Sequence, residues 1–375
     1  YIRKQDIKEK ANKYIFYIAS LCALATGIQL VFIGSLIPIV FFALYEIYIG
    51  KKFIIKDFSK KIFFIDLFKC FLMFYFILVF FWIDVHSNLF SQPIKILMGT
   101  LSETYWTGWP YNLVNGEYSL TINTTKLYFL INLIYKSPEY MLVCYLIFFF
   151  FLIVCNNFYK KKIYFFNYKI FFIFILLLFP NVLIFFIPYP LYDGMRLFLW
   201  AVPYYSIIPG LVIYYFINNY SQVLQKTFIF MLSFLCVFHL FNFFLITPYH
   251  YTYLNYLNGD IKYRYQKFEN DYWGASIKEL IKNTKLEKDT FISITTCGIN
   301  TYIVKKHLKK SGYANFKFVS QNDADYVIMT NRAEADDKID ATNVNESISC
   351  FDKFTGTNIS EVKRNGAILS VVRKI

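Results

Sequence analysis

The sequence predicts a multi-pass α-helical membrane protein with a small extracytoplasmic α/β domain at its carboxyl end. Of 375 residues, 57% are hydrophobic and 22% are Phe, Trp or Tyr, whereas only 17% are charged. That balance is far from the composition of an average soluble domain. Stretches such as 62–83 and 165–187 stay apolar for about 20 residues, the length at which a helix crosses the hydrocarbon of a bilayer. The residues after 250 change to the shorter patterns of a soluble α/β domain.

The apolar stretches predict helices and not barrel strands, because their apolarity is continuous and does not alternate. We predict about seven of them, near residues 14–28, 30–49, 62–83, 138–155, 170–187, 196–216 and 227–246. Lysine clusters at 1–13, 51–61 and 160–169 then lie on one side, and the positive-inside rule assigns that side to the cytoplasm. We therefore attribute the net charge of +14 to cytoplasmic loops that orient the chain in the membrane. We expect no nucleic-acid partner.

This threading places the connection 84–137, the turn 188–195 and everything after 247 outside the cytoplasm. We divide the chain into a membrane region, 1–250, which contains the external loop 84–137, and an extracytoplasmic α/β domain, 251–375. Loops carry function while a scaffold positions them. We therefore expect one site assembled from these external segments.

The last hundred residues have the pattern of an α/β domain. Residues 290–296, 316–319, 326–330 and 367–372 read as strands, and 300–310 reads as a helix with Ile303 and Leu308 facing inward. The Cys297-Gly298 turn lacks the GxGxxG pattern of a dinucleotide site. A structural or acceptor-docking role is favoured there over nucleotide binding.

The seven cysteines are far apart and show no CxxC spacing. Only Cys297 and Cys350 lie in the tail, so one disulfide is open to them, although free thiols are favoured. The four histidines are scattered, which argues against a zinc site. We predict no metal-binding residues.

The turn between two predicted helices places Asp193 and Arg196 three residues apart at the membrane interface. In one interpretation Asp193 caps the helix that Arg196 enters, the two side chains pair, and Pro188 and Pro190 stiffen the approach. In the other, Arg196 holds the phosphate of a lipid-linked substrate beside a helix N-terminus. Spacing alone favours the cap.

Aromatic residues gather on both sides of residue 260. They alternate along Tyr249, Tyr251, Tyr253 and Asn255, and they join carboxylates in the segment Phe268-Glu-Asn-Asp271-Tyr272-Trp273-Gly274. The plain interpretation is an aromatic belt at headgroup depth. Aromatic faces combined with carboxylates are also typical of sugar-binding surfaces.

The first external loop holds Trp106 and Trp109, then Glu117, and finally Lys136-Ser137-Pro138 at a helix start, where proline is favoured. The tryptophans serve equally well as interface anchors.

Together and in this order, these segments resemble membrane glycosyltransferases of the GT-C superfamily, near the bacterial relatives of the protein O-mannosyltransferases. The loop is similar in Gly116-Glu117, Tyr128 and Lys136-Ser137-Pro138. The turn is similar in Leu191-Tyr192-Asp193-Gly194-x-Arg196-x-Phe198-Leu199, with Leu197 where the family often has His. The segments Pro248-Tyr249-x-Tyr251-x-Tyr253-x-Asn255 and Asp271-Tyr272-Trp273-Gly274 match the family's lead into its external tail. The resemblance covers residues 15–285.

The resemblance implies an inverting transfer of a sugar from a polyprenyl-phosphate donor to a glycan, lipid or protein acceptor on the extracytoplasmic face of the cell (inner) membrane. The family's catalytic Asp lies in the first external loop near the amino end, and no position of this chain matches it. We therefore expect it before Tyr1, in an amino-terminal part that the chain lacks. Departure of the phosphate needs a cation. We expect no certain cofactor, and a divalent cation is compatible with this chemistry.

The resemblance also assigns candidate residues. Arg196 is the first candidate to bind the donor phosphate, with Asp193 orienting it and Lys136 as a second cation. The candidates for the substrate cleft are Glu117, Tyr249, Tyr251, Tyr253, Asn255, Asp271, Tyr272 and Trp273.

Two other classes of function stay open. A transporter or flippase of lipid-linked intermediates would also need many helices and an external charged site. Transport pathways usually carry ionisable residues at mid-membrane depth, whereas Glu46, Asp66 and Lys69 lie towards the ends of predicted helices. A non-catalytic scaffold subunit of an envelope complex is the third hypothesis.

Overall fold

The computed structural model describes residues 7–30, 32–51, 58–100, 109–187, 189–286, 291–335 and 347–375. Helices form at all seven predicted positions. Six of them are long and apolar enough to cross a membrane, and a bent pair of helices makes a seventh if it counts as one span. The six are Glu9–Ile28, Phe32–Gly50, Lys60–Phe81, Phe166–Phe186, Gly194–Asn219 and Gln222–Leu245. The first is longer than predicted, because the helix continues through the basic stretch before residue 14.

The chain forms two compact units, each built from segments that are distant in sequence. The first unit comprises Tyr1–Thr107, Lys160–Tyr189 and Arg196–Tyr205, and the second comprises Gly108–Tyr159, Pro190–Met195 and Ser206–Ile375. The division at residue 250 that the sequence suggests stays a prediction.

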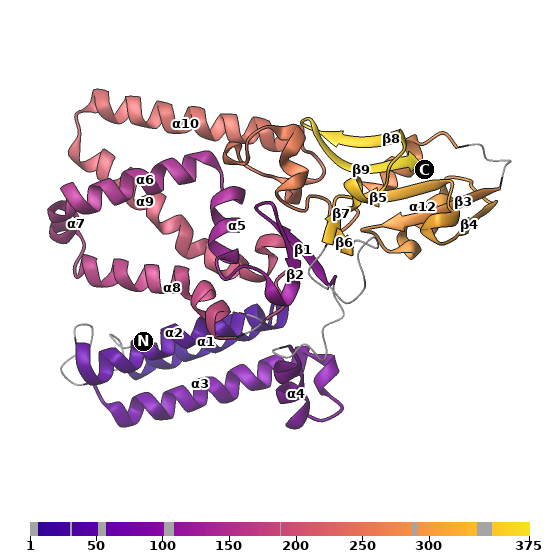
Figure 1. Ribbon diagram of the computed structural model, residues 1–375. Helices are drawn as coiled ribbons and strands as arrows, with labels where there is room; N and C mark the ends of the chain where they lie inside the picture. The colour runs from indigo at the N-terminus through magenta and orange to yellow at the C-terminus, as the bar shows by residue number, and fades with distance from the viewer. Residues whose placement is uncertain are drawn as a thin grey trace. The chain divides into compact units, whose positions relative to one another are not determined.

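The first unit is helical (Figure 1). Its helices are α1 (Lys8–Ile28), α2 (Phe32–Tyr45) with the π-helix η1 (Glu46–Gly50), α3 (Lys60–Phe81), α4 (Ser91–Thr100) and α8 (Phe166–Phe186). Small side chains set the packing of α1 against α3. Ala11, Ala19 and Ala23 lie on one face of α1 at intervals of four or eight residues, with the larger Ile15 between the first two, and all four are buried. Such a stripe lets two backbones approach closely, which is how membrane helices pack where the hydrophobic effect is weak.

The second unit contains the helices α5 (Tyr128–Lys136), α6 (Glu139–Val154), α10 (Gln222–Leu245), α11 (Ile277–Asn283), α12 (Thr301–Lys310) and α13 (Cys350–Lys353). Three further helices, α7 (Asn156–Lys162), η5 (Gly194–Ala201) and α9 (Val202–Asn219), have residues in both units. Helices α5 and α6 are bent by 113° at Ser137-Pro138. The predicted helix 138–155 corresponds to α6, whereas α5 lies in the predicted external loop 84–137. The chain turns between them because the residue before a proline avoids the helical region.

A five-stranded sheet of the second unit has the order β4-β3-β5-β9-β8 (Figure 1). Its strands are β4 (Phe316–Phe318), β3 (Ile292–Cys297), β5 (Tyr326–Thr330), β9 (Ala367–Lys374) and β8 (Thr357–Arg364). The first three are parallel, and the last two run antiparallel as a hairpin. Two small antiparallel pairs, β1 (Tyr111–Val114) with β2 (Glu117–Leu120) and β6 (Ala333–Ala335) with β7 (Ser347–Ser349), stand apart from it.

The core of this region joins α11 and α12 to the sheet. Val304 and Leu308, one helical turn apart on α12, are fully buried with Ile294 of β3 and Ile328 of β5. Asn300 caps α12 by accepting a hydrogen bond from the backbone N–H of Tyr302 at 2.8 Å. The predicted inward position of Leu308 is confirmed, and the α/β pattern is present where the sequence placed it.

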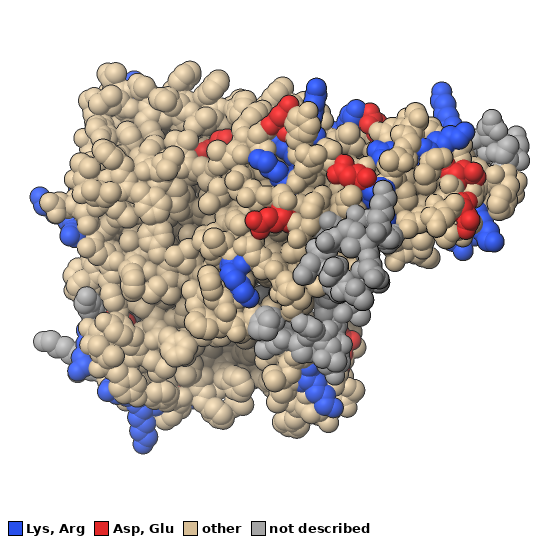
Figure 2. Space-filling model, viewed as in Figure 1, with Lys and Arg blue, Asp and Glu red and all other residues tan. Residues whose placement is uncertain are grey.

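The surface of the second unit has one part with few charged residues and one part with many (Figure 2). In this view, the surface over α6 and α10 is almost entirely uncharged, whereas Lys, Arg, Asp and Glu gather over the sheet. A broad apolar surface without charge is what lipid would cover.

A candidate site of four charges and two tryptophans

Four charged side chains of the second unit converge at one place. Lys136 ends α5, Asp193 precedes η5, Glu269 lies ahead of α11, and Arg332 follows β5. Asp193 and Glu269 are buried, Arg332 is 11% exposed, and Lys136 is partly buried. Charged groups are buried in proteins only when they are paired or have a function.

Arg332 lies at the centre of the cluster. Its Nη2 lies 3.5 Å from Asp193 Oδ1, and its Nε lies 3.8 Å from Glu269 Oε2. Its Nη1 donates a hydrogen bond to the carbonyl of Tyr272 at 2.8 Å, and its guanidinium carbon lies 4.8 Å from the centre of the Trp109 ring. The guanidinium therefore connects both carboxylates and stacks on an aromatic face, as arginine does at sites for anions.

The turn at Asp193-Gly194 is shaped for this contact. Both residues have left-handed backbone conformations, with φ of 55° and 62°. Aspartate tolerates this region better than most residues and glycine adopts it freely. Asp193 Oδ2 accepts a hydrogen bond from Trp273 Nε1 at 3.0 Å. A side chain at Gly194 would collide with Lys136 Nζ, so the absence of a Cβ makes room for the ammonium group.

Burial perturbs the acid and the base in opposite directions. It raises the pKa of Glu269 to about 7, although Arg332, the backbone N–H of Ala333 and Lys136 stabilise the carboxylate. The amide of Ala333 donates to Glu269 Oε1 at 3.0 Å. Lys136 ends α5, outside the six candidate spans, and desolvation lowers its pKa to about 8 even though Glu269 and Asp193 act against the shift. Both groups therefore titrate close to neutrality, which is typical of functional sites.

Two tryptophans flank the charges. Trp109 Nε1 donates to the carbonyl of Ala333 at 2.7 Å, which holds its ring against Arg332. Trp273 is 50% exposed and lies beside Tyr251, with ring centres 5.3 Å apart. An exposed aromatic face next to carboxylates offers a sugar ring both apolar contact and hydrogen-bond acceptors.

Several predicted cleft residues instead hold the surrounding backbone. Asn255 is buried and donates to the carbonyls of Ile134 and Ser137, at 2.6 and 2.9 Å, across the bend between α5 and α6. Asp271 is buried and accepts from the backbone N–H groups of Ala275 and Ser276, each at 2.9 Å. These contacts fix the segments that carry Lys136, Glu269 and Trp273.

The alternating tyrosines each contact a carboxylate. Tyr249 donates to Glu279 at 2.8 Å and Tyr253 donates to Glu139 at 2.9 Å, while Tyr251 donates to Asp271. The contacts with Asp271 and with the rings of Tyr272 and Trp273 place Tyr251 next to the charge cluster. Tyr249 lies in the hydrophobic core of the sheet region.

The remaining predicted site residues lie elsewhere. Glu117 is exposed at the start of β2. Arg196 is exposed and belongs to the first unit, where its carbonyl accepts a hydrogen bond from Gln29 Nε2 at 2.6 Å. Its phosphate-binding role stays a prediction. Trp106 and Pro188 lie outside the described residues.

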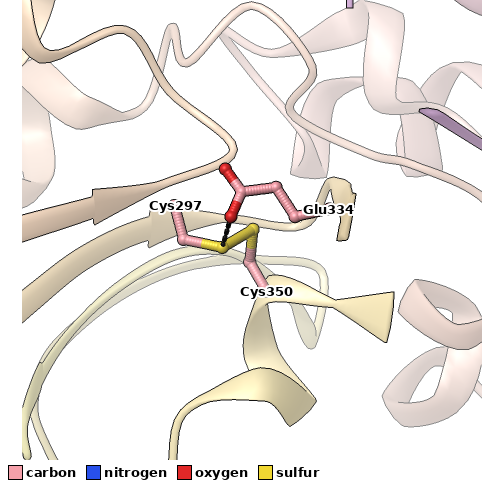
Figure 3. Close-up of side chains that lie close together, drawn as sticks. All are labelled: Cys297, Glu334 and Cys350. Atoms are coloured by element: carbon pink, nitrogen blue, oxygen red, sulfur yellow. Dashed lines mark hydrogen bonds between the residues drawn. A yellow bond between two sulfur atoms is a disulfide. The ribbon is translucent and has the colours of Figure 1, made fainter. Parts of the chain in front are cut away.

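A second cluster joins Cys297, Cys350 and Glu334 (Figure 3). The two cysteines form a disulfide, so the preference for free thiols was wrong. The backbone N–H of Gly298 donates to Glu334 Oε1 at 3.2 Å, and Lys353 Nζ lies 3.6 Å from Glu334 Oε2. All three side chains are close enough to hold a metal ion, but thiolates are needed for that and the disulfide removes them. The cluster is therefore structural in its oxidised form.

Sequence reasoning missed Arg332 and did not select Glu269 or Trp109. A signal for Arg332 existed. It lies two residues after the end of β5, and ligands of α/β sheets bind beyond the carboxyl ends of parallel strands. No family model, curated protein or solved structure matches the chain.

Proposed function

We propose that the protein is an integral membrane glycosyltransferase that moves a sugar from a polyprenyl-phosphate donor to an acceptor outside the cytoplasm, with inversion at the anomeric carbon. The observation that carries this proposal is the convergence of three sequence segments on one cluster. Lys136 comes from the external loop, Asp193 from the turn and Trp273 from the lead into the tail. These are the segments in which the sequence resembles the GT-C superfamily.

The charge of the cluster suits a phosphodiester. With all four groups ionised, two positive and two negative charges cancel. When Glu269 takes up a proton, which its pKa of about 7 permits near neutrality, the cluster carries one net positive charge. A lipid-phosphate sugar carries one negative charge. Arg332 offers the planar donor group that phosphate oxygens prefer, and Lys136 offers a second cation.

In this proposal the cluster binds and orients the donor. The acceptor hydroxyl attacks the anomeric carbon and loses its proton to a carboxylate, while the bond from that carbon to the phosphate oxygen breaks and its electron pair leaves with the lipid phosphate. Arg332 and Lys136 stabilise the charge that grows on the phosphate. The aromatic faces of Trp109 and Trp273 hold the sugar.

The proposed location is the cell membrane, with the sheet region outside the cytoplasm. Six apolar helices of sufficient length support the membrane placement. The disulfide between Cys297 and Cys350 supports the external side, because disulfides persist in oxidising compartments and are rare in the cytosol.

The test is transfer by the protein expressed from its complete gene and purified in detergent. Synthetic polyprenyl-phosphate hexoses and pentoses serve as donors, membrane extract serves as the acceptor source, and mass spectrometry follows release of polyprenyl phosphate. We expect Arg332→Gln to lower kcat/KM by about 100-fold, the usual cost of losing a charge-stabilising donor. Lys305→Gln, an exposed lysine on α12, is the matched control and should leave turnover unchanged.

Wild-type turnover in Arg332→Gln would remove the cluster from the reaction. Movement of intact donor across a vesicle membrane, without cleavage, would replace the transferase by a flippase.

A further inference from the structure

A small cavity lies at the end of α10, apart from the charge cluster. Its volume is about 30 Å³. It is bounded by the last turn of α10, by residues 252–256, by η8 (Ile261–Gln266) and by the turn between β8 and β9. All of these belong to the second unit. The residues that line it include two arginines, Arg264 and Arg364, and no carboxylate among those that the structure describes.

Two buried polar atoms of the lining have no hydrogen-bond partner within the described residues. One is the donor Nη2 of Arg264, a residue that is 7% exposed, and the other is the acceptor Oδ1 of Asn270, which is 3% exposed. The rest of the Arg264 side chain is fixed, since Nη1 donates to the carbonyl of Leu254 at 2.8 Å and Nε donates to that of Gly259 at 3.2 Å. Buried polar groups are normally satisfied, so the two atoms indicate a missing partner.

The partner must accept from a cation and also donate to an amide oxygen. A water molecule meets both needs and fits the volume, but it carries no charge. Within the described part of the chain, the guanidinium of Arg264 donates only to neutral carbonyls, and Glu139 and Asp260 act on it without forming an ion pair. Arg364 is occupied, because its guanidinium pairs with Glu279 and donates to the carbonyl of Thr247 at 2.9 Å. A phosphate oxygen carries the missing negative charge and is a ligand whose geometry suits a guanidinium group.

The surroundings identify the source of that phosphate. The helix α10 is a candidate span, and its last turn exposes Phe241, Phe244 and Leu245. Asn242 of the same turn and Ile246 just after it line the cavity. Acyl chains lying along α10 would therefore bring a headgroup to the cavity mouth, at the depth where a span ends.

We propose that this cavity binds the headgroup of a membrane phospholipid, with a phosphate oxygen on Arg264 and a headgroup hydroxyl or ammonium donating to Asn270. The proposal rests on the membrane placement in the proposed function and not on sugar transfer. It assigns Arg264 and Asn270 a lipid-anchoring role that is separate from the donor site.

The test uses the full chain in detergent, titrated with dihexanoyl phosphatidylglycerol and followed by native mass spectrometry. We expect Arg264→Gln and Asn270→Asp each to weaken binding at least tenfold. Asn270→Asp preserves the size of the side chain and introduces a charge that repels the phosphate. It therefore still tests the site if Arg264→Gln does not fold. Lys262→Gln removes an exposed charge two residues from Arg264 and should bind like wild type.

Two further probes identify the ligand. Dihexanoyl phosphatidylcholine has no headgroup donor and should bind several-fold more weakly than phosphatidylglycerol, a difference that Asn270→Leu should abolish. Inorganic phosphate should bind more weakly than either lipid. Equal affinity for inorganic phosphate would overturn the lipid assignment, and equal weakening by Lys262→Gln would overturn the site itself.

The outcome is independent of the transferase test. No sugar donor is present in the titration, and Lys136→Met, which should lose transfer, should retain full binding of phosphatidylglycerol. Loss of binding only in the Arg264 and Asn270 variants supports the lipid site whatever the result of the transfer assay.

Discussion

The position of Lys136 depends on one residue that has no side chain. Gly194 approaches Lys136 Nζ so closely that any Cβ would displace the ammonium, and its φ of 62° is itself unfavourable for other residues. Backbone strain and collision therefore act together at this position. Asp193 shares the left-handed conformation and directs its carboxylate to Trp273 and Arg332.

Gly194→Ala should therefore destabilise the protein by about 1–3 kcal/mol, the cost of a strained backbone position, and should impair donor binding as Lys136 moves. Gly210→Ala is the control, because Gly210 lies in α9 with no atom near its Cβ position and alanine favours helices. Thermal unfolding in detergent measures both variants. Equal stability of the two would contradict the tight contact at Gly194.

The protonation of Glu269 should govern donor affinity. Below a pH of about 7 the carboxyl is protonated and the cluster carries one positive charge; above that pH the cluster is neutral, so affinity for a phosphodiester falls. Above a pH of about 8 Lys136 loses its proton and affinity falls again. The first step should be about tenfold, a modest value for one charge in partly screened surroundings.

The affinity for a non-transferable polyprenyl-phosphate sugar, measured by titration at a series of pH values from about 5.5 to about 9, tests this dependence. Glu269→Gln should abolish the step near neutrality and retain the second. An identical profile in this variant and wild type would assign the pH dependence to another group.

The elements of this fold were predictable to different degrees. The long apolar helices follow from composition alone, because lipid forces every backbone group to be satisfied within the segment. The strands β3, β5 and β9 were also visible as short β-branched or apolar runs. The strand β8, Thr-Asn-Ile-Ser-Glu-Val-Lys-Arg, was missed because it is mostly polar and exposed, with only Val362 buried. Pairing with β9 decides its structure, and local propensity does not.

The candidate site was predictable only in part. Asp193, Lys136 and Trp273 were selected through the resemblance of their segments to the GT-C superfamily. Arg332 is 139 residues from its partner Asp193, so their contact depends on tertiary packing that no local pattern encodes. The roles of Asn255 and Asp271 as backbone supports were equally hidden, because an amide or a carboxylate in a loop fits ligand binding and capping alike.

The disulfide links the end of β3 to the start of α13, which follows β7. Its cysteines are 53 residues apart, and a closed loop of that length stabilises a fold by about 4 kcal/mol. Cys297→Ser should lower the unfolding free energy of the sheet region by roughly that amount. Cys350→Ser should have a similar effect, and the double variant should add little. Thermal unfolding with and without a reductant checks this, and additive losses would mean that the two cysteines act separately.

The number of membrane crossings between two loops determines whether those loops lie on the same side of the membrane. If the basic clusters 51–61 and 160–169 share the cytoplasmic side, an even number of crossings separates them. Helix α3 is one crossing, so α6, the apolar arm of the bent pair, must be the second, although the geometry of the pair alone also allows a re-entrant loop. The two remaining apolar helices before Tyr220, α8 and α9, then return the chain to the cytoplasm, and α10 delivers the sheet region to the outside.

Reporter fusions test this topology directly. Alkaline phosphatase, which folds only outside the cytoplasm, should be active when joined after Ile375, and a fluorescent protein that folds only inside should be bright when joined after Lys161 or Tyr220. Lys161 cannot change side by itself, because the crossings that follow it fix the sides of all later segments relative to it. A dark fusion at Lys161 would therefore mean that the bent pair α5 and α6 re-enters the membrane and that every later segment lies on the opposite side. The disulfide would then face a reducing compartment, and both the donor site and the lipid site would have to be reassigned to the cytoplasmic leaflet.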